Sequence, residues 1–216
     1  MRIHKDCLGT ILSTCSVALL VLILVLIFID SRPISTIICS VILSFIYFVV
    51  WFHRLPERER NEQSNLVSAV ADGKIVIIEK VFEKEYLQKE CIQVSIYMDF
   101  FDVHSNFWPM TGEISYYKYH DGRYLLAFHP KASEKNEHSS TAIRNEHGEI
   151  LFKQIAGTFA RRIVCYSEEG KMVESGGDCG IIKFGSRIDY FLPLDADIKV
   201  KVGQHTIASE TVIAEL

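Results

Sequence analysis

Residues 181–193 read IIKFGSRIDYFLP, two β-like runs that are separated by the pair Gly185-Ser186. Both runs are rich in β-branched and aromatic residues, which is typical of buried strands. Glycine inside a strand pattern usually marks a turn or a bulge. The simplest interpretation of the pair is therefore structural. A chemical interpretation, in which Ser186 attacks its own backbone, needs support from the rest of the chain.

The same β-like pattern continues through most of the chain after residue 65, and turn dipeptides such as Asp-Gly and Gly-Gly separate the runs. No stretch of useful length there has a helical period. The expected strands lie within 74–82, 91–98, 112–119, 123–128, 149–157, 161–167, 181–184, 187–192, 197–202 and 205–216. The sequence therefore predicts a mainly β fold, a sandwich or barrel-like domain over residues 66–216, which is long enough to bury its own core.

The first 54 residues have a different composition. Residues 8–29 and 34–52 contain no charged side chain, and each stretch is long enough to cross the hydrocarbon layer as a helix. A secretory signal peptide is disfavoured, because the first run is too long, no cleavage site follows it, and a second span comes at once. We expect a two-helix transmembrane hairpin in residues 1–54, followed by a polar linker in residues 55–65.

Positive charges flank this hairpin on both sides. Arg2 and Lys5 precede the first span, and Arg54, Arg58 and Arg60 follow the second. The positive-inside rule places both ends in the cytoplasm, so we expect the β domain on the cytoplasmic side of the cell (inner) membrane.

The charge balance and the cysteines narrow the function further. Residues 1–60 carry six Lys/Arg and four Asp/Glu, whereas the remainder carries 17 and 23, and an acidic domain argues against binding to nucleic acid. The six cysteines include no CxxC pair. This spacing favours a reduced, cytosolic set without a zinc site, and we expect no metal.

Three further stretches carry residues capable of chemistry. Asp72 precedes Gly73 at the head of an expected strand, His104 follows an apolar run, and Asn136-Glu137 lies in a polar segment that we expect to be a loop. Taken singly, each has a structural explanation: a hairpin turn, a core histidine and a solvated loop.

Taken together and in order, these stretches resemble a known family. The resemblance runs from about Trp51 to the C-terminus, through FHRLPER, ADGKI, DVHSNFWPMTGEI, KASEKNEHSS, QIAGTFARRIV, GDCGIIKFGSRIDYFLP and VKVGQHTIASETVIAEL. The chain is similar to the short, bacterial and archaeal type of phosphatidylserine decarboxylase, a pyruvoyl-dependent enzyme that is made as a proenzyme.

The resemblance implies that the chain cleaves itself between Gly185 and Ser186. Ser186 would attack the Gly185 carbonyl and end as a pyruvoyl group at the start of a small chain, which stays with the large chain. Glycine leaves the carbonyl open to attack, and serine supplies the nearest nucleophile. The pyruvoyl cofactor would form a Schiff base with phosphatidylserine of the membrane and yield phosphatidylethanolamine.

The resemblance also implies roles for other residues. Ser186 needs a base, and the base needs an orienting partner; we expect Asp72 and His104 to fill these catalytic roles. The candidates to hold the phosphate or carboxylate of the substrate, which the sequence does not rank, are Arg161, Arg162, Lys183 and Arg187. The chain departs from the family pattern at Phe107, where a second histidine is found, at Val70, where proline is usual, and at His138, where arginine is usual. The first departure leaves open whether His104 serves self-cleavage, decarboxylation or both.

Two alternative functions remain at this stage. A homo-oligomer is compatible with each alternative and with the decarboxylase. The C-terminal segment has the cadence of lipoyl- and biotin-carrier domains, so a noncatalytic membrane-tethered carrier or interaction module is the first alternative, with Lys171 as its candidate carrier residue. A pyruvoyl decarboxylase of another amino-bearing substrate is the second.

Overall fold

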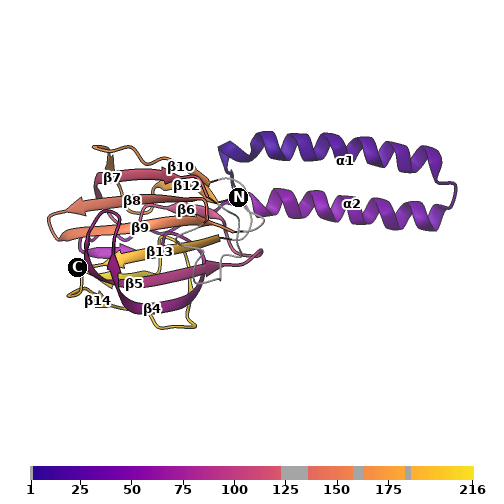
Figure 1. Cartoon of the computed structure of the whole chain (residues 1–216). Helices are drawn as coiled ribbons and strands as arrows, with labels where there is room; N and C mark the ends of the chain where they lie inside the picture. The colour runs from indigo at the N-terminus through magenta and orange to yellow at the C-terminus, as the bar shows by residue number, and fades with distance from the viewer. Residues whose placement is uncertain (1, 123–135, 158–162, 183–185) are drawn as a thin grey trace. The chain divides into compact units, whose positions relative to one another are not determined.

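A computed structural model of the chain describes residues 2–122, 136–157, 163–182 and 186–216. It divides into two compact units, Met1–Pro56 and Glu57–Leu216. The first unit contains the two apolar helices, and the second contains the β domain (Figure 1). The prediction of a mainly β domain preceded by two apolar helices is confirmed.

The N-terminal unit is a helical hairpin. Its helices are α1 (Leu8–Phe28) and α2 (Arg32–Phe52), preceded by the short 3-10 helix η1 (Lys5–Cys7). Strands β1 (Arg2–Ile3) and β2 (Arg54–Leu55) pair at its base. Both long helices are apolar enough to cross a membrane, and most of their large side chains are exposed, as lipid-facing surfaces require. The two helices can therefore anchor the chain to a membrane.

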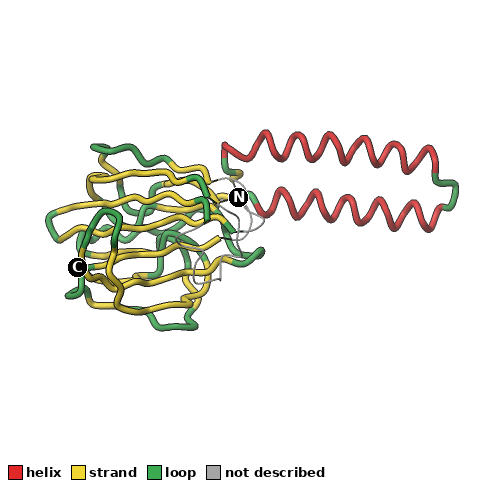
Figure 2. The backbone as a smooth tube through the Cα atoms, in the orientation of Figure 1, coloured by secondary structure: helices red, strands yellow, loops and turns green. Residues whose placement is uncertain are grey.

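The β domain is built on one curled antiparallel sheet of eight strands (Figure 2). In spatial order its strands are β11 (Met172–Val173), β7 (Gly112–His120), β8 (His138–Asn145), β9 (Gly148–Ala156), β13 (Ser186–Leu192), β5 (Lys89–Met98), β4 (Gly73–Glu83) and β15 (His205–Thr206). Strand β13 thus lies near the middle of the sheet, with β9 on one side and β5 on the other.

Two smaller sheets accompany the large one. The first contains β10 (Ile163–Cys165), β12 (Asp178–Ile182) and β6 (Ser105–Phe107), and the second contains β14 (Asp197–Ile198), β16 (Val212–Glu215) and β3 (Leu66–Ser68). Residues from all three sheets contribute to one hydrophobic cluster. The small sheets therefore cover the inner face of the large one.

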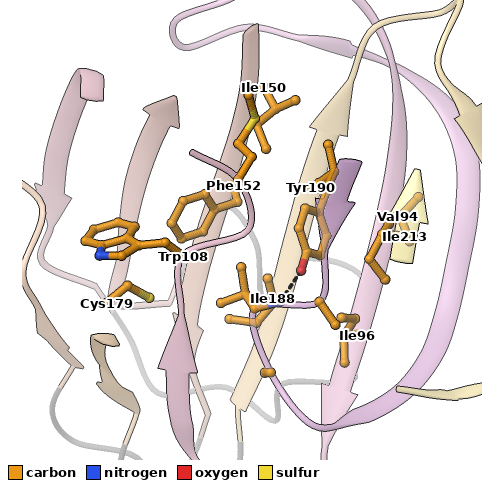
Figure 3. Packing of buried hydrophobic residues seen from close by; sticks show 14 of the residues in the cluster. Val94, Ile96, Trp108, Ile150, Phe152, Cys179, Ile188, Tyr190 and Ile213 are labelled. Atoms are coloured by element: carbon orange, nitrogen blue, oxygen red, sulfur yellow. Dashed lines mark hydrogen bonds between the residues drawn. The ribbon is translucent and has the colours of Figure 1, made fainter. Parts of the chain in front are cut away.

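The core follows from the alternation of side chains along the strands. Phe152 of β9 and Tyr190 of β13 are cross-strand partners and lie side by side in Figure 3. Trp108 packs edge-on against Phe152, with 6.3 Å between ring centroids. The Tyr190 hydroxyl accepts a hydrogen bond from the Val70 backbone N–H at 2.5 Å. This bond fixes the segment just before Asp72.

The sequence-based strand prediction differs from the structure in several places. Residues 205–216 were expected to be one strand, but the structure has two separate strands there, His205–Thr206 and Val212–Glu215. Strand β8, with the sequence HSSTAIRN, was not expected, because its polar residues hide the alternation; the structure buries its first six residues. Residues 197–202 were expected to be one strand, but only Asp197–Ile198 is a strand. The expected strand at 123–128 lies outside the described residues.

Candidate active site

Ser186 is the first residue of β13, and it lies between Met98 of β5 and Ala156 of β9. The side chain is completely buried. Its Oγ lies 2.9 Å from the Met98 sulfur, a weak acceptor that leaves the hydroxyl proton loosely held. Side chains alternate along a strand, so Ser186 shares the inner face of the sheet with Ile188 and Tyr190. Ser186 is therefore the first residue of a central strand of the sheet.

His104 lies just before β6 and is completely buried. Its Nδ1 is 3.0 Å from the carbonyl oxygen of Asp102. A carbonyl can only accept a hydrogen bond, so Nδ1 carries the proton of the neutral ring and Nε2 carries the lone pair. The carbonyl of His104 accepts a hydrogen bond from Ile182 N at 3.2 Å. This contact brings the histidine backbone to the end of β12, four residues before Ser186.

Asp72 is held by contacts from two distant segments. Its Oδ2 accepts a hydrogen bond from Arg58 Nη2 at 2.7 Å, and its Oδ1 accepts one from the backbone N–H of Ala208 at 2.8 Å. The Thr206 hydroxyl lies 3.1 Å from the carbonyl oxygens on both sides of Asp72, those of Ala71 and Gly73. The carboxylate is thus fixed and ion-paired.

Asp102 joins the neighbourhoods of His104 and Asp72, which the sequence did not reveal. Its Oδ1 lies 3.1 Å from Nε2 of His205, and its Oδ2 accepts a hydrogen bond from Asp99 N at 2.8 Å. Burial raises the pKa of Asp102, and the negative charges of Asp99 and Asp72 add to this effect. Asp72 and Asp102 therefore form a shared acidic environment, and Asp102 contacts His104 through its backbone carbonyl.

The segment around Asn136 is buried, in contrast to the expected solvated loop. Asn136 Nδ2 donates a hydrogen bond to the carbonyl of Ala156 at 2.7 Å, and the carbonyl of Glu137 accepts one from Ala156 N at 2.9 Å. Because Ala156 is the strand partner of Ser186, this segment supports one wall of the site. The side chains of Asn136 and Glu137 form hydrogen bonds within the domain. The amino-acid composition of the segment could not reveal this burial.

Asn106 supplies a buried polar group on the same side of the sheet. Its Oδ1 accepts a hydrogen bond from Gln154 Nε2 at 2.8 Å. Its Nδ2 is buried and has no hydrogen-bond partner within the part of the chain that the structure describes. Gln154 lies two residues before Ala156, on the face that Ser186 also occupies. A buried amide N–H without an acceptor lowers the stability of the fold. Such a donor is suited to stabilising an oxygen atom that develops negative charge during a reaction.

The predicted substrate-binding residues fall into two groups. Arg187 lies on the sheet face opposite to Ser186, where it contacts Asp189 and Ser95. Arg161, Arg162, Lys183 and the cleavage-site residue Gly185 lie outside the described residues. Ser186, His104 and Asp72 all belong to the β domain, and their catalytic roles remain predictions.

One side-chain cluster has donors suitable for a metal ion. The candidate ligand atoms of Glu85, His120 and His138 lie within 4.8 Å of one another. However, the ammonium of Lys153 already lies 2.6 Å from the Glu85 carboxylate, and the two imidazole rings stack almost in parallel, 4.3 Å apart. A metal must lie near the plane of each ligating ring, which stacked rings do not allow. The cluster is accordingly an ion-pair network in this structure.

Comparison with known proteins decides the family. The model of the family described as phosphatidylserine decarboxylase matches residues 45–214. The chain belongs to the phosphatidylserine decarboxylase family. A phosphatidylserine decarboxylase proenzyme of Cytophaga hutchinsonii is 42% identical over 217 residues, covering 100% of this chain and 99% of the relative. One of Porphyromonas gingivalis is 37% identical over 219 residues, with the same coverage. A third, of Amoebophilus asiaticus, is 46% identical over 170 residues, 78% of this chain and 76% of the relative.

Membership of the phosphatidylserine decarboxylase family makes this chain a decarboxylase. The resemblance inferred from the ordered motifs is confirmed. The alternative of a noncatalytic carrier or interaction module is not supported, because the relatives that match the whole chain are enzymes made as proenzymes.

Proposed function

We propose that this protein decarboxylates phosphatidylserine to phosphatidylethanolamine, using a pyruvoyl group that it makes from its own Ser186. The observation that carries the proposal is the position of Ser186. It is buried at the start of a central strand, and among the described residues its hydroxyl is hydrogen-bonded only to the weak acceptor Met98 Sδ. The names of the relatives, which are phosphatidylserine decarboxylase proenzymes, support both the substrate and the processing.

In the proposed self-cleavage, Ser186 Oγ attacks the carbonyl carbon of Gly185. A new C–O bond replaces the C–N bond, so the amide becomes an ester with a free amine on residue 186. β-Elimination then releases Gly185 as a carboxylate and leaves dehydroalanine at position 186. Water hydrolyses this group to a ketone and ammonia. The products are a large chain that ends at residue 185 and a small chain of residues 186–216.

His104 and Asn106 supply the groups that this step needs. Serine is a weak nucleophile without a base, and the Nε2 lone pair of His104 provides one. The oxygen of the Gly185 carbonyl gains negative charge as the bond forms. We assign as its donor Asn106 Nδ2, which has no hydrogen-bond partner among the described residues. Asp72 keeps its place through Arg58 and Ala208 and sets the electrostatics around Asp102.

A pyruvoyl ketone at residue 186 supplies the carbonyl that joins the amine of phosphatidylserine and accepts the electrons left when carbon dioxide departs. The residues of the chain itself exclude water and transfer protons. The buried face around Ser186 excludes water from the reacting atoms, and His104 returns a proton to the carbon that loses carbon dioxide. Helices α1 and α2 hold the enzyme at the membrane that contains its substrate, on the cytoplasmic side of the inner membrane in our proposal.

The test is a comparison of substrates on the purified full chain. Enzyme in mixed micelles is given phosphatidylserine, and a parallel sample is given free serine. Release of carbon dioxide with phosphatidylethanolamine formed only from the lipid supports the proposal. Equal or faster release from free serine would assign the chemistry to a soluble amino substrate instead.

A further inference from the structure

Arg187 is one of the largest completely buried side chains of the protein, at 2% exposure. Its Nε donates a hydrogen bond to Asp189 Oδ1 at 2.5 Å, and its Nη2 donates one to Ser95 Oγ of the neighbouring strand at 3.1 Å. Asp189 is fully buried as well, and its Oδ2 has no partner among the described residues. Arg187 and Asp189 therefore form a desolvated ion pair on the outer face of the sheet.

Stability alone is a poor reason for such a pair. The cost of desolvating two buried charges offsets most of their attraction. Well-packed hydrophobic residues at the same positions often give a protein of equal stability. The two residues are also two positions apart on one strand, so their contact does not tie separate strands together. What the pair does restrict is the conformation of residues 187–189, and the Ser95 contact fixes this segment to β5.

This segment directly follows Ser186. Once the bond before residue 186 is cut, β13 begins at a new chain end, and chain ends fray unless they are tied down. The acyl group of residue 186 is carried by the backbone nitrogen of Arg187, so the position of Arg187 sets the position of the reactive carbonyl. We propose, on the basis of the proposed function, that Arg187, held by Asp189 and Ser95, is a positioning residue that fixes the newly formed N-terminus of the small chain for decarboxylation.

The same geometry argues against a direct contact between Arg187 and the lipid. Its side chain points to the outer face, whereas Ser186 belongs to the inner face. It lines a cavity of about 790 Å³ on that outer face, together with Lys153 and Phe191. Removal of the Arg187 side chain would leave a space of guanidinium size at this cavity, so chemical rescue by guanidinium is a practical test.

The first test needs no substitution. Hydrogen exchange is measured on the processed wild-type protein in micelles, with peptides that start at residue 186. We expect the amides of residues 187–189 to exchange as slowly as those of residues 190–192 in the same strand. Exchange within seconds at residues 187–189 alone would show a frayed end and overturn the proposal.

The second test uses Arg187→Ala, with Lys153→Ala as a matched control, because Lys153 is also a buried cation at the same cavity. For Arg187→Ala we expect kcat to fall about 10-fold or more with KM within about twofold, and guanidinium chloride at low concentration to restore kcat severalfold. For Lys153→Ala we expect an unchanged kcat and no effect of guanidinium. An Arg187→Ala protein with wild-type kcat contradicts the positioning role.

The outcomes separate this inference from the proposed function. A wild-type chain that never cleaves contradicts the proposed function itself. A cleaved, active wild type together with an active Arg187→Ala variant contradicts only the role of Arg187. If Arg187→Ala does not fold, the exchange measurement on the wild type decides.

Discussion

The Nδ1 atom of His104 lies 3.0 Å from the carbonyl oxygen of Asp102, which holds the ring proton on one side and leaves the Nε2 lone pair on the other. A backbone carbonyl cannot be removed by substitution. The tautomer of His104 with its proton on Nδ1 is therefore set by the backbone conformation and not by a second side chain. The Asp102 side chain is free to pair with His205 instead. In our proposal this arrangement makes His104 the base in a chain that has Phe107 where the family pattern has a second histidine.

Replacement of His104 tests this base. We expect His104→Gln to lower the rate of self-cleavage or of decarboxylation by about 10²–10⁴-fold, because a general base is lost while the buried volume is nearly kept. Cleavage is followed by gel mobility and turnover by release of carbon dioxide. His147→Gln, which changes a histidine in an exposed turn, is the control. If both variants match the wild type, His104 is a structural residue.

Replacement of Asn106 tests the proposed donor to the Gly185 carbonyl. We expect Asn106→Ala to slow self-cleavage by about 10²–10³-fold, because a developing oxyanion loses its hydrogen bond. Gln154→Ala is a useful comparison, because it removes the hydrogen bond to Asn106 Oδ1 but leaves Nδ2 in place. Equal effects of the two substitutions would point to a loss of packing rather than of the donor.

The ion-pair network around Glu85 predicts a pH dependence of stability. Burial raises the pKa of Glu85, but the hydrogen bonds and charge of Lys153, with His120 and Ser140, outweigh it and lower the value from 4.5 to about 2. A carboxyl group whose pKa is lower in the folded protein than in the unfolded chain stabilises the fold at pH values above the unfolded-state pKa. This contribution to stability is lost as the pH falls from 4.5 through 2. The shift corresponds to about 3 kcal/mol.

The Glu85→Gln variant is therefore expected to be less stable than the wild type at pH 7 by about 3 kcal/mol, with the difference disappearing toward pH 2. Urea unfolding of the full chain in micelles, followed by Trp108 fluorescence, measures this difference. Exposed Glu146→Gln serves as the control. A constant difference at every pH would mean that packing, not ionisation, is responsible.

Val70 replaces the proline of the family pattern, and its N–H donates to the Tyr190 hydroxyl. Proline has no N–H, so we expect Val70→Pro to lower the free energy of unfolding by about 1–2 kcal/mol. In a Tyr190→Phe background the same substitution should cost clearly less, because the acceptor is already gone. The free energies of unfolding are measured with urea. If the effects of the two substitutions are additive in the double variant, the hydrogen bond between Val70 N–H and the Tyr190 hydroxyl does not explain the loss of stability.

Patterns of hydrophobicity predicted much of the fold. The apolar stretches 8–29 and 34–52 correspond closely to α1 and α2, and the alternation in 91–98 and 187–192 corresponds to β5 and β13. Strand β8 was missed because its serines and threonine are buried against polar partners: Ser139 bonds to Gln154, and Thr141 bonds to Ser167. A single sequence shows that a residue is polar, but not that its partner lies on a distant strand.

The candidate site shows the same limit. Asp72, His104 and Ser186 were selected from motifs, but the side chains of Asp72 and Ser186 are held by contacts from residues far away in the chain. Arg58 and Ala208 hold Asp72, and they lie 14 and 136 residues from it. Such contacts depend on the closure of the sheets and leave no local signal in the sequence. The outer-face pair of Arg187 and Asp189 likewise became visible only once the register of β13 was known.

The central claim is that Ser186 becomes a ketone at the start of the small chain. Intact-mass spectrometry of the purified full chain, with and without borohydride, measures this most directly, and Ser186→Ala is the control. We expect the wild type to give two chains that meet at the 185–186 bond, with a small chain whose mass rises by two hydrogens on reduction, and the variant to stay whole. A wild-type chain that remains whole, or a small chain that borohydride does not change, would contradict the account.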